Sequence, residues 1–125
     1  MVGLGNQPAM PGPRRGDIHF LVFRDVGGNV IFGPHPAVIV QADRMSRSST
    51  TLVVPLTSKV RSADLAPPYI VRVTARDTGL DRDGWVKADQ LFTFPTAELG
   101  PRAGRFGAAR LAALDAALRF VLDLA

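Results

Sequence analysis

Polar residues that can carry acid–base chemistry stand at the ends of two short apolar runs. His35 opens one run, which continues over residues 36–40, and Thr57 with Ser58 closes another over residues 51–56. Strand ends are rigid and accessible to solvent, which is where small β-rich proteins place reactive groups. The pattern predicts a site that combines an imidazole with a pair of hydroxyl groups.

The chemistry that suits these groups is proton transfer without a metal ion. RNA cleavage by its own 2′-hydroxyl group, for example, needs a base, an acid and donors that stabilise the phosphorane. His35, Thr57 and Ser58 supply such groups. So do Lys87 and Asp89, which share one side of a strand because they are two residues apart. The simpler alternatives are a surface ion pair for the latter two and a local turn for the hydroxyl pair.

Metal and nucleotide chemistry have little support. The aspartates of residues 77–84 (DTGLDRDG) resemble an oxygen-ligand loop, but Arg82 interrupts them and a calcium loop's terminal glutamate is missing, which favours a solvated turn. His19 and His35 stand on different elements without a carboxylate pattern, so His19 is expected to be packed or hydrogen-bonded rather than to bind zinc. A nucleophile elbow and a phosphate-binding glycine loop are both absent. We therefore predict neither a metal ion nor a cofactor.

The composition is that of a small globular protein. The 125 residues are 46% hydrophobic and include no cysteine, so we expect one domain with a modest core and no disulfides. Because no apolar stretch is long enough to span a membrane and no signal pattern opens the chain, we expect a cytoplasmic protein. The net charge of +4 favours polyanions such as nucleic acid, although the excess is spread along the chain.

Hydrophobic periodicity outlines a β-rich domain that ends in a helix. Residues 1–13 are rich in Gly and Pro, which predicts a flexible tail, and residues 14–125 are predicted to form a single domain. Strands are predicted over residues 17–24, 37–42, 50–56 and 69–75, and over a fifth segment that begins at Trp85 and continues through residues 92–94. From Gly107 on, leucines recur at helical spacing. This order predicts a mainly β, α+β fold with one helix packed on the sheet or barrel.

Five short motifs lie in order along residues 14–124. They are Arg15–Ile18, His35–Val40, Pro55–Ser58, Val86–Gln90 with Thr93, and the leucine-rich C-terminal helix preceded by Leu99–Gly100. Together they resemble the motifs of the MazF/PemK (Kid) family of toxin endoribonucleases from type II toxin–antitoxin modules. Their order and spacing are specific to that pattern.

The resemblance implies a fold, an activity and partners. The fold would be a small five-stranded SH3-like barrel with a C-terminal helix, as in CcdB, Kid and MazF. The activity would be metal-independent cleavage of single-stranded RNA by a cytoplasmic homodimer that has no cofactor and no membrane contact. The partner would be a cognate antitoxin whose acidic, disordered C-terminal segment fills the RNA groove, and DNA would be contacted only through that antitoxin.

The resemblance also implies roles within the site. The family's catalytic threonine falls on Thr57, and its strand-five arginine and aspartate fall on Lys87 and Asp89. Its catalytic arginine falls on His35, and a histidine is charged only part of the time and offers two nitrogens instead of a forked donor set. The catalytic residues implied are thus His35, Thr57, Lys87 and Asp89. The RNA-binding residues implied are Asn29, Gly33, Pro36, Ser58, Lys59 and Gln90.

Two further departures from the family pattern leave two functions open. Residues 29–33 are largely apolar where the family usually has Glu-Gln-Gly-Gly, and Phe92 stands where an arginine is expected. Phe32 and Phe92 either stack on bases or belong to the core or to a partner surface. The first hypothesis is an active, diverged endoribonuclease in which His35 does the acid–base or phosphate-stabilising work. The alternative is a catalytically weak or inactive module that binds antitoxin or RNA, while gyrase poisoning, as by the CcdB fold, has no support beyond the fold.

Overall fold

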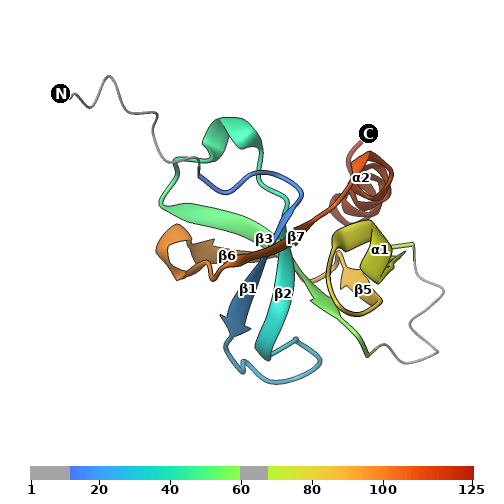
Figure 1. Ribbon diagram of the computed structural model, residues 1–125. Coiled ribbons are helices and arrows are strands. Elements are labelled where there is room, and N and C mark those ends of the chain that lie inside the picture. Colours follow the sequence, from blue (N-terminus) through green and yellow to red (C-terminus); the bar gives the residue numbers. More distant parts are fainter. Residues whose placement is uncertain (1–11, 60–67) are drawn as a thin grey trace.

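The computed structural model describes residues 12–59 and 68–125, which form a curled antiparallel sheet with a helix beside it (Figure 1). The strands are β1 (Asp17–Phe23), β2 (Gly33–Ile39), β3 (Thr50–Thr57), β4 (Ile70–Val73), β5 (Gly84–Lys87), β6 (Phe92–Pro95) and β7 (Arg102–Arg105). The helices are α1 (Ala75–Thr78) and α2 (Ala108–Leu122), with short 3-10 turns η2 (Asp43–Met45) and η4 (Thr96–Glu98). The strand order is β4-β5-β3-β2-β1-β7, and β6 also pairs with β3. The predicted α+β fold class is confirmed, and the predicted tail over residues 1–13 lies almost entirely outside the described residues.

Strand β2 begins at Gly33, four residues earlier than predicted from the sequence. Pro34 and Pro36 lie within it, opposite Val22 and Phe20 of β1. An antiparallel ladder alternates hydrogen-bonded and non-hydrogen-bonded pairs, so prolines two residues apart can occupy positions where no N–H is needed. The prediction failed because the prolines were interpreted as a strand boundary, and His35 therefore lies inside β2 rather than ahead of it.

The predicted fifth strand is in fact two strands that pair with different parts of β3. Leu56 lies opposite Val86 of β5, whereas Leu52 lies opposite Thr93 of β6. The described residues therefore contain seven strands rather than five. Strand β7 was missed because its sequence, RAGR, has no hydrophobic alternation, and it is defined by its pairing with β1.

The chain turns into helix α1 directly after β4, where the sequence predicted that the strand continued to residue 75. Thr74 caps this helix: its Oγ1 accepts from the Asp77 N–H (3.1 Å), and Asp77 Oδ2 accepts from the Thr74 N–H (2.9 Å). This reciprocal pair satisfies two donors at the helix start. The Thr74 backbone N–H, followed by the Thr74 hydroxyl, holds the pKa of the Asp77 carboxyl below its usual range. Asp83 Oδ1 accepts from the Ala75 N–H (2.8 Å), so these aspartates stabilise the turn.

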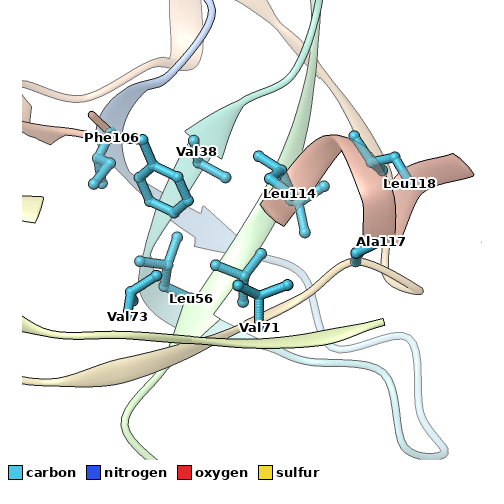
Figure 2. Close-up of a cluster of buried hydrophobic side chains, with 12 residues drawn as sticks. Val38, Leu56, Val71, Val73, Phe106, Leu114, Ala117 and Leu118 are labelled. Atoms are coloured by element: carbon cyan, nitrogen blue, oxygen red, sulfur yellow. The ribbon is translucent and has the colours of Figure 1, made fainter. Parts of the chain in front are cut away.

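Helix α2 packs its apolar face against the sheet (Figure 2). Leu114, Ala117 and Leu118 meet a cluster that includes Val71 and Phe106. Burying one such large apolar side chain contributes about 1.5–3 kcal/mol. A second cluster fills the other face of the sheet, with Leu21, Phe23, Ala37, Ile39, Val53 and Phe94. The two clusters give the sheet two apolar faces, which explains why β1 is apolar on both sides.

Helix α2 is also tied to the start of the domain by an ion pair. Arg15 Nη2 lies 2.7 Å from Asp115 Oδ1, and Arg15 Nε donates to the Val40 carbonyl oxygen (3.0 Å). The four-residue spacing of Asp115 and Arg119 would also allow an ion pair along the helix, but the structure pairs Asp115 with Arg15. In the described part of the chain, neither helix has the length and hydropathy needed to cross a membrane.

Candidate functional site

Two open hollows lie near the ends of β3 and β5. The first, of about 370 Å³, is here called the His35 hollow. It is lined by Phe20, Pro34, His35, Pro36, Leu56, Thr57, Ser58, Val73, Leu80, Asp81, Arg82, Asp83 and Gly84. The second, of about 400 Å³, is called the Lys87 hollow. It is lined by Asn29, Val30, Tyr69, Ile70, Lys87, Asp89 and Gln90.

The residues implied by the family resemblance divide between these hollows. His35, Pro36, Thr57 and Ser58 line the first hollow, and Asn29, Lys87, Asp89 and Gln90 line the second. Gly33 and Lys59 line neither, although Gly33 begins β2 and Lys59 lies two residues beyond Thr57. The structure thus gathers most of these residues at one region of the sheet while keeping the imidazole and the ammonium group in separate hollows.

The His35 side chain is half-buried and held by two contacts. Its ring stands edge-on to Phe23, with ring centroids 6.2 Å apart. Its Nε2–H donates to the Phe32 carbonyl oxygen (3.0 Å). A carbonyl oxygen only accepts, so this bond places a proton on Nε2. In the neutral ring, Nδ1 is then the nitrogen that can accept a proton.

The Thr57 hydroxyl lies at the end of β3 and takes part in a local turn. Its Oγ1 accepts from the Lys59 N–H (3.1 Å) and donates to the Lys59 carbonyl oxygen (3.3 Å). From the sequence, a local turn was the simpler alternative to a functional role for this hydroxyl. The structure contains that turn, and the turn holds the hydroxyl at the rim of the His35 hollow. In the antiparallel β2–β3 ladder Ala37 lies opposite Pro55. His35, two residues before Ala37, and Thr57, two residues after Pro55, therefore lie toward the same end of the two strands. Both therefore approach the His35 hollow from neighbouring strands.

Lys87 ends β5 and shares a face of the sheet with the Thr57 side chain. Thr57 lies opposite Trp85 in the β3–β5 ladder, and Lys87 is two residues beyond Trp85, so period-two alternation puts all three side chains on one face. Asp89 is exposed in the turn after β5, so the prediction that Lys87 and Asp89 share one side of a strand is wrong, because the strand ends at Lys87. Among the ion pairs of the described residues, none joins Lys87 to Asp89, so the surface-pair alternative is not supported.

Gln90 fastens the β1–β2 loop to the end of β5. Its Oε1 accepts from the Ile31 N–H (2.7 Å), and its Nε2–H donates to the Asn29 carbonyl oxygen (3.0 Å). The side-chain amide is thus engaged by the loop backbone on both of its polar atoms. Because Asn29 and Val30 form one wall of the Lys87 hollow, Gln90 helps to shape that hollow. No local sequence pattern indicates these contacts, because Gln90 is 59 positions from Ile31 and 61 positions from Asn29 along the chain.

Other lining residues also went unrecognised in the sequence. Phe20, 47% exposed, contributes an apolar wall to the His35 hollow, and Asp81 and Arg82 contribute charge. Alternation along β1 predicts the face on which Phe20 lies but not which hollow it borders. Phe92 is half-buried and packs edge-on against Phe23, with ring centroids 4.8 Å apart, which favours the alternative that it belongs to the core. Phe32 remains 57% exposed.

His19, the other histidine, does not reach either hollow. Its Nδ1–H donates to the Gly100 carbonyl oxygen (2.8 Å), as expected for a hydrogen-bonded residue within a strand. The site is therefore built from one imidazole, one positioned hydroxyl and one ammonium group on or next to strands β2, β3 and β5. These groups can accept a proton, donate to an anionic oxygen and neutralise charge, respectively.

Comparison with known protein families identifies a matching model over nearly the whole domain. The model described as "PemK-like, MazF-like toxin of type II toxin-antitoxin system" matches residues 14–122. The chain is 36% identical over 117 residues to Endoribonuclease MazF9 of Mycobacterium tuberculosis, which covers 89% of this chain and 97% of that protein. It is 28% identical over 112 residues to Endoribonuclease EndoA of Bacillus subtilis, with 89% and 95% covered.

Solved structures give the same picture. An endoribonuclease in complex with its cognate antitoxin, from a mycobacterial species, superposes with a TM-score of 0.72 at 27% identity, covering 91% of this chain and 98% of that one. MazF from Deinococcus radiodurans shares the fold, with a TM-score of 0.74 at 21% identity and 90% and 98% covered. The similarity therefore extends from sequence to fold over the same residues.

Proposed function

Because the chain belongs to the PemK-like, MazF-like toxin family of type II toxin–antitoxin systems, we propose that it cleaves single-stranded RNA without a metal ion. In this proposal the RNA's own 2′-hydroxyl group attacks the neighbouring phosphate at the His35 hollow. The family is one of endoribonucleases, and relatives of nearly the same length carry that name.

In the proposed mechanism, His35 is the base. Its Nδ1 accepts the 2′-hydroxyl proton, while the bond from Nε2–H to the Phe32 carbonyl oxygen fixes the ring. The Thr57 hydroxyl gives up its long 3.3 Å hydrogen bond to the Lys59 carbonyl oxygen and donates instead to a non-bridging phosphate oxygen. The Lys87 ammonium group neutralises charge and is the acid available to the leaving 5′-oxygen. Asp89 lines the same hollow as that ammonium group and supplies a carboxylate there.

One observation carries the proposal: an imidazole from β2 and a hydroxyl from β3 line the same 370 Å³ hollow. Strands hold such groups more firmly than loops do, and firm placement is what acid–base catalysis requires. The flanking Lys59 and Lys87 add positive charge for the RNA backbone.

The proposal is tested by incubating the protein with a mixed-sequence RNA in excess EDTA. Cleavage is expected, and His35→Ala and Thr57→Ala are each expected to slow it at least about 100-fold. Met45→Ala is the matched control, because Met45 is exposed in η2, which precedes β3 and lies away from the Thr57 end. Activity that appears only when Mg²⁺ is restored, or variants as active as the parent, would contradict the mechanism.

A second candidate function is favoured by one observation at His35. Its Nε2 is engaged by the chain's own loop, and that loop exposes the apolar side chains of Val26 and Phe32. These features suit a module that binds RNA or antitoxin without cutting. RNA that is bound tightly by folded protein and recovered intact would support this second function over the first.

As a toxin of this family, the chain has a cognate antitoxin as its partner. We propose that an acidic, disordered C-terminal segment of the antitoxin covers the hollows, since this chain carries a net charge of +4. A synthetic peptide of that segment is expected to compete with RNA and to block cleavage. Inhibition that does not weaken as the RNA concentration rises would argue against a shared site.

We also propose that the chain is a homodimer. The C-terminal end of α2 and the residues after it expose three large apolar side chains, Phe120 (58%), Leu122 (47%) and Leu124 (60%), and exposed apolar surface of this kind suits an interface. Light scattering is expected to give twice the mass of the chain, and Phe120→Glu is expected to lower it toward one chain. A monomer at every concentration of the unaltered protein would refute the proposal.

A further inference from the structure

A row of side chains crosses the sheet from the Thr57 hydroxyl to an arginine on β4. Thr57 lies opposite Trp85 in the β3–β5 ladder, and Trp85 lies opposite Arg72 in the β4–β5 ladder. Directly opposite residues have Cβ atoms about 5 Å apart and point to the same face. A hydroxyl, an indole and a guanidinium group therefore stand side by side.

This row lies on the solvent side of that part of the sheet. The alternate residues of the same strands, Leu56, Val71 and Val86, are buried in the core beneath α2. Trp85 is half-buried and the Arg72 side chain is 57% exposed. The row also runs between the two hollows, because Thr57 lines the His35 hollow, while Lys87 and Ile70, the next β4–β5 pair on the same face, line the Lys87 hollow.

The guanidinium group of Arg72 lies over one face of the indole, with its central carbon 5.2 Å from the Trp85 ring centroid. Its ion pair with Asp83 is long, at 3.5 Å, so it keeps N–H donors for another anion. Tryptophan offers the best aromatic face for such a contact. The row, together with Lys87 on the same face, thus presents an aromatic surface and two cations next to the proposed catalytic hydroxyl.

We infer that Trp85 and Arg72 form a nucleobase-binding subsite, in which the indole face away from Arg72 stacks on the base next to the phosphate held at Thr57 and Arg72 binds the following phosphate. The inference rests on the proposed RNA cleavage and adds to it a contact that the sequence comparison did not assign. Aromatic side chains beside positively charged groups are how proteins hold single-stranded nucleic acid, since every base has a face to stack.

An acidic peptide is the other polyanion that this surface could attract. Arg72 and Lys87 would serve either ligand, but a peptide carboxylate gains nothing from the indole face, whereas a base does. The row therefore favours RNA, and the peptide becomes an arm of the test.

The chain contains a single tryptophan, so its fluorescence reports on Trp85 alone. The full-length Thr57→Ala protein, which is not expected to cut, is titrated with a mixed-sequence single-stranded RNA of about ten nucleotides. Inorganic polyphosphate and oligoglutamate serve as base-free polyanions. Quenching is expected with the RNA and not with the two base-free probes. Quenching by oligoglutamate and none by RNA would overturn the inference.

Substitutions in the same Thr57→Ala background measure the size of the contact by fluorescence anisotropy of labelled RNA. Trp85→Leu is expected to weaken RNA binding about tenfold or more, and Trp85→Phe, which keeps an aromatic face, much less. Arg72→Met is expected to reduce the slope of log affinity against log salt by about 0.7, and Met45→Ala to change nothing. If Trp85→Leu fails to fold, the fluorescence titration of the Thr57→Ala protein, which keeps Trp85, still tests whether RNA contacts the indole.

The result also separates this inference from the proposed function. RNA cleavage by the unaltered protein together with no quenching and no effect of Trp85→Leu would refute the subsite and leave the cleavage mechanism standing. Quenching together with no cleavage would refute the mechanism and leave the subsite standing.

Discussion

At the scale of single residues, His35 is the point at which the family resemblance implies the largest departure. The family resemblance puts an arginine at this position, and an arginine is always charged and donates through a planar fork. Here the imidazole packs on Phe23 and donates from Nε2 to the Phe32 carbonyl oxygen. In this account the histidine works as a proton acceptor, a role that an arginine cannot fill.

Replacing His35 by arginine tests that role. His35→Arg is expected to bind RNA with a steeper salt dependence, by about 0.7 in the slope of log affinity against log salt, because it adds one fixed positive charge. Its cleavage rate is expected to exceed that of His35→Ala, since the guanidinium group can still stabilise the phosphorane. An unchanged salt slope would show that position 35 does not face the RNA backbone.

Gln90 offers a second test at this scale. Gln90→Met keeps the length of the side chain but removes both hydrogen bonds to Asn29 and Ile31, each worth about 1 kcal/mol. The Ile31 amide is expected to exchange with solvent faster and RNA cleavage to fall. Leu91→Ala, at the neighbouring exposed position, is the control and should preserve both. Unchanged exchange at Ile31 would mean that the loop is held by other contacts.

The part of the site that could be predicted from the sequence is the set of polar residues at the ends of apolar runs. That pattern indicated His35 and Thr57, and the structure places both at one hollow. The contacts of Gln90 and the position of Trp85 beside Thr57 depend on register and on loop closure, which no local pattern encodes. The assignment of catalytic roles remains a prediction.

At the scale of elements, β7 is held by a close approach to α1. A Cβ atom on Gly104 would collide with the Thr78 carbonyl oxygen. Gly104→Ala is therefore expected to lower the free energy of unfolding by about 1–3 kcal/mol, as overpacking does. Urea denaturation measures the change, and a loss below about 0.5 kcal/mol, typical of a neutral surface substitution, would show that the two elements can move apart.

Helix α1 gives a prediction about pH. The Thr74 N–H and hydroxyl hold the pKa of Asp77 below its usual range, so the ionised carboxyl stabilises the folded state. A lowered pKa in the folded state means that this stabilisation is present above about pH 4, the usual pKa of an aspartate, and is lost as pH falls through the folded-state value.

Asp77→Asn, which keeps a hydrogen-bond acceptor but loses the charge, is the variant that isolates this effect. It is expected to be less stable than the parent at neutral pH and to approach it in stability as the pH falls below about 4. Thermal unfolding across that range measures the difference. A constant difference at every pH would show that the charge of Asp77 is not involved.

Elements with a clear local sequence pattern were predicted well, and the others were not. Strand β1 is a run rich in bulky apolar residues and was predicted to within one residue at each end, and α2 repeats leucines at helical spacing and was predicted to within one residue at its start. The start of β2, the division between β5 and β6, and the whole of β7 depend on which strand lies alongside. Pairing partners far apart in sequence decide such boundaries, so a local window cannot locate them.

At the scale of the whole molecule, the groups proposed to act on RNA collect at one end of the sheet. Figure 1 shows the β1–β2 connection at one end and η2 at the other, with α2 to one side. Strands β1, β2 and β3 run between these ends, so the ends of the strands near the β1–β2 connection carry His35 and Thr57. The remaining end and α2 are free for other contacts, including the proposed second copy of the chain.

The central claim is that the RNA's own 2′-hydroxyl group is the nucleophile. The direct measurement maps one cleavage position in an RNA and then replaces the ribose on its 5′ side by a 2′-deoxyribose, with EDTA present throughout. The account predicts that cleavage at that position stops in the substituted RNA and that the unsubstituted RNA yields a 2′,3′-cyclic phosphate. Cleavage of the substituted RNA at the same position and at a similar rate would contradict it.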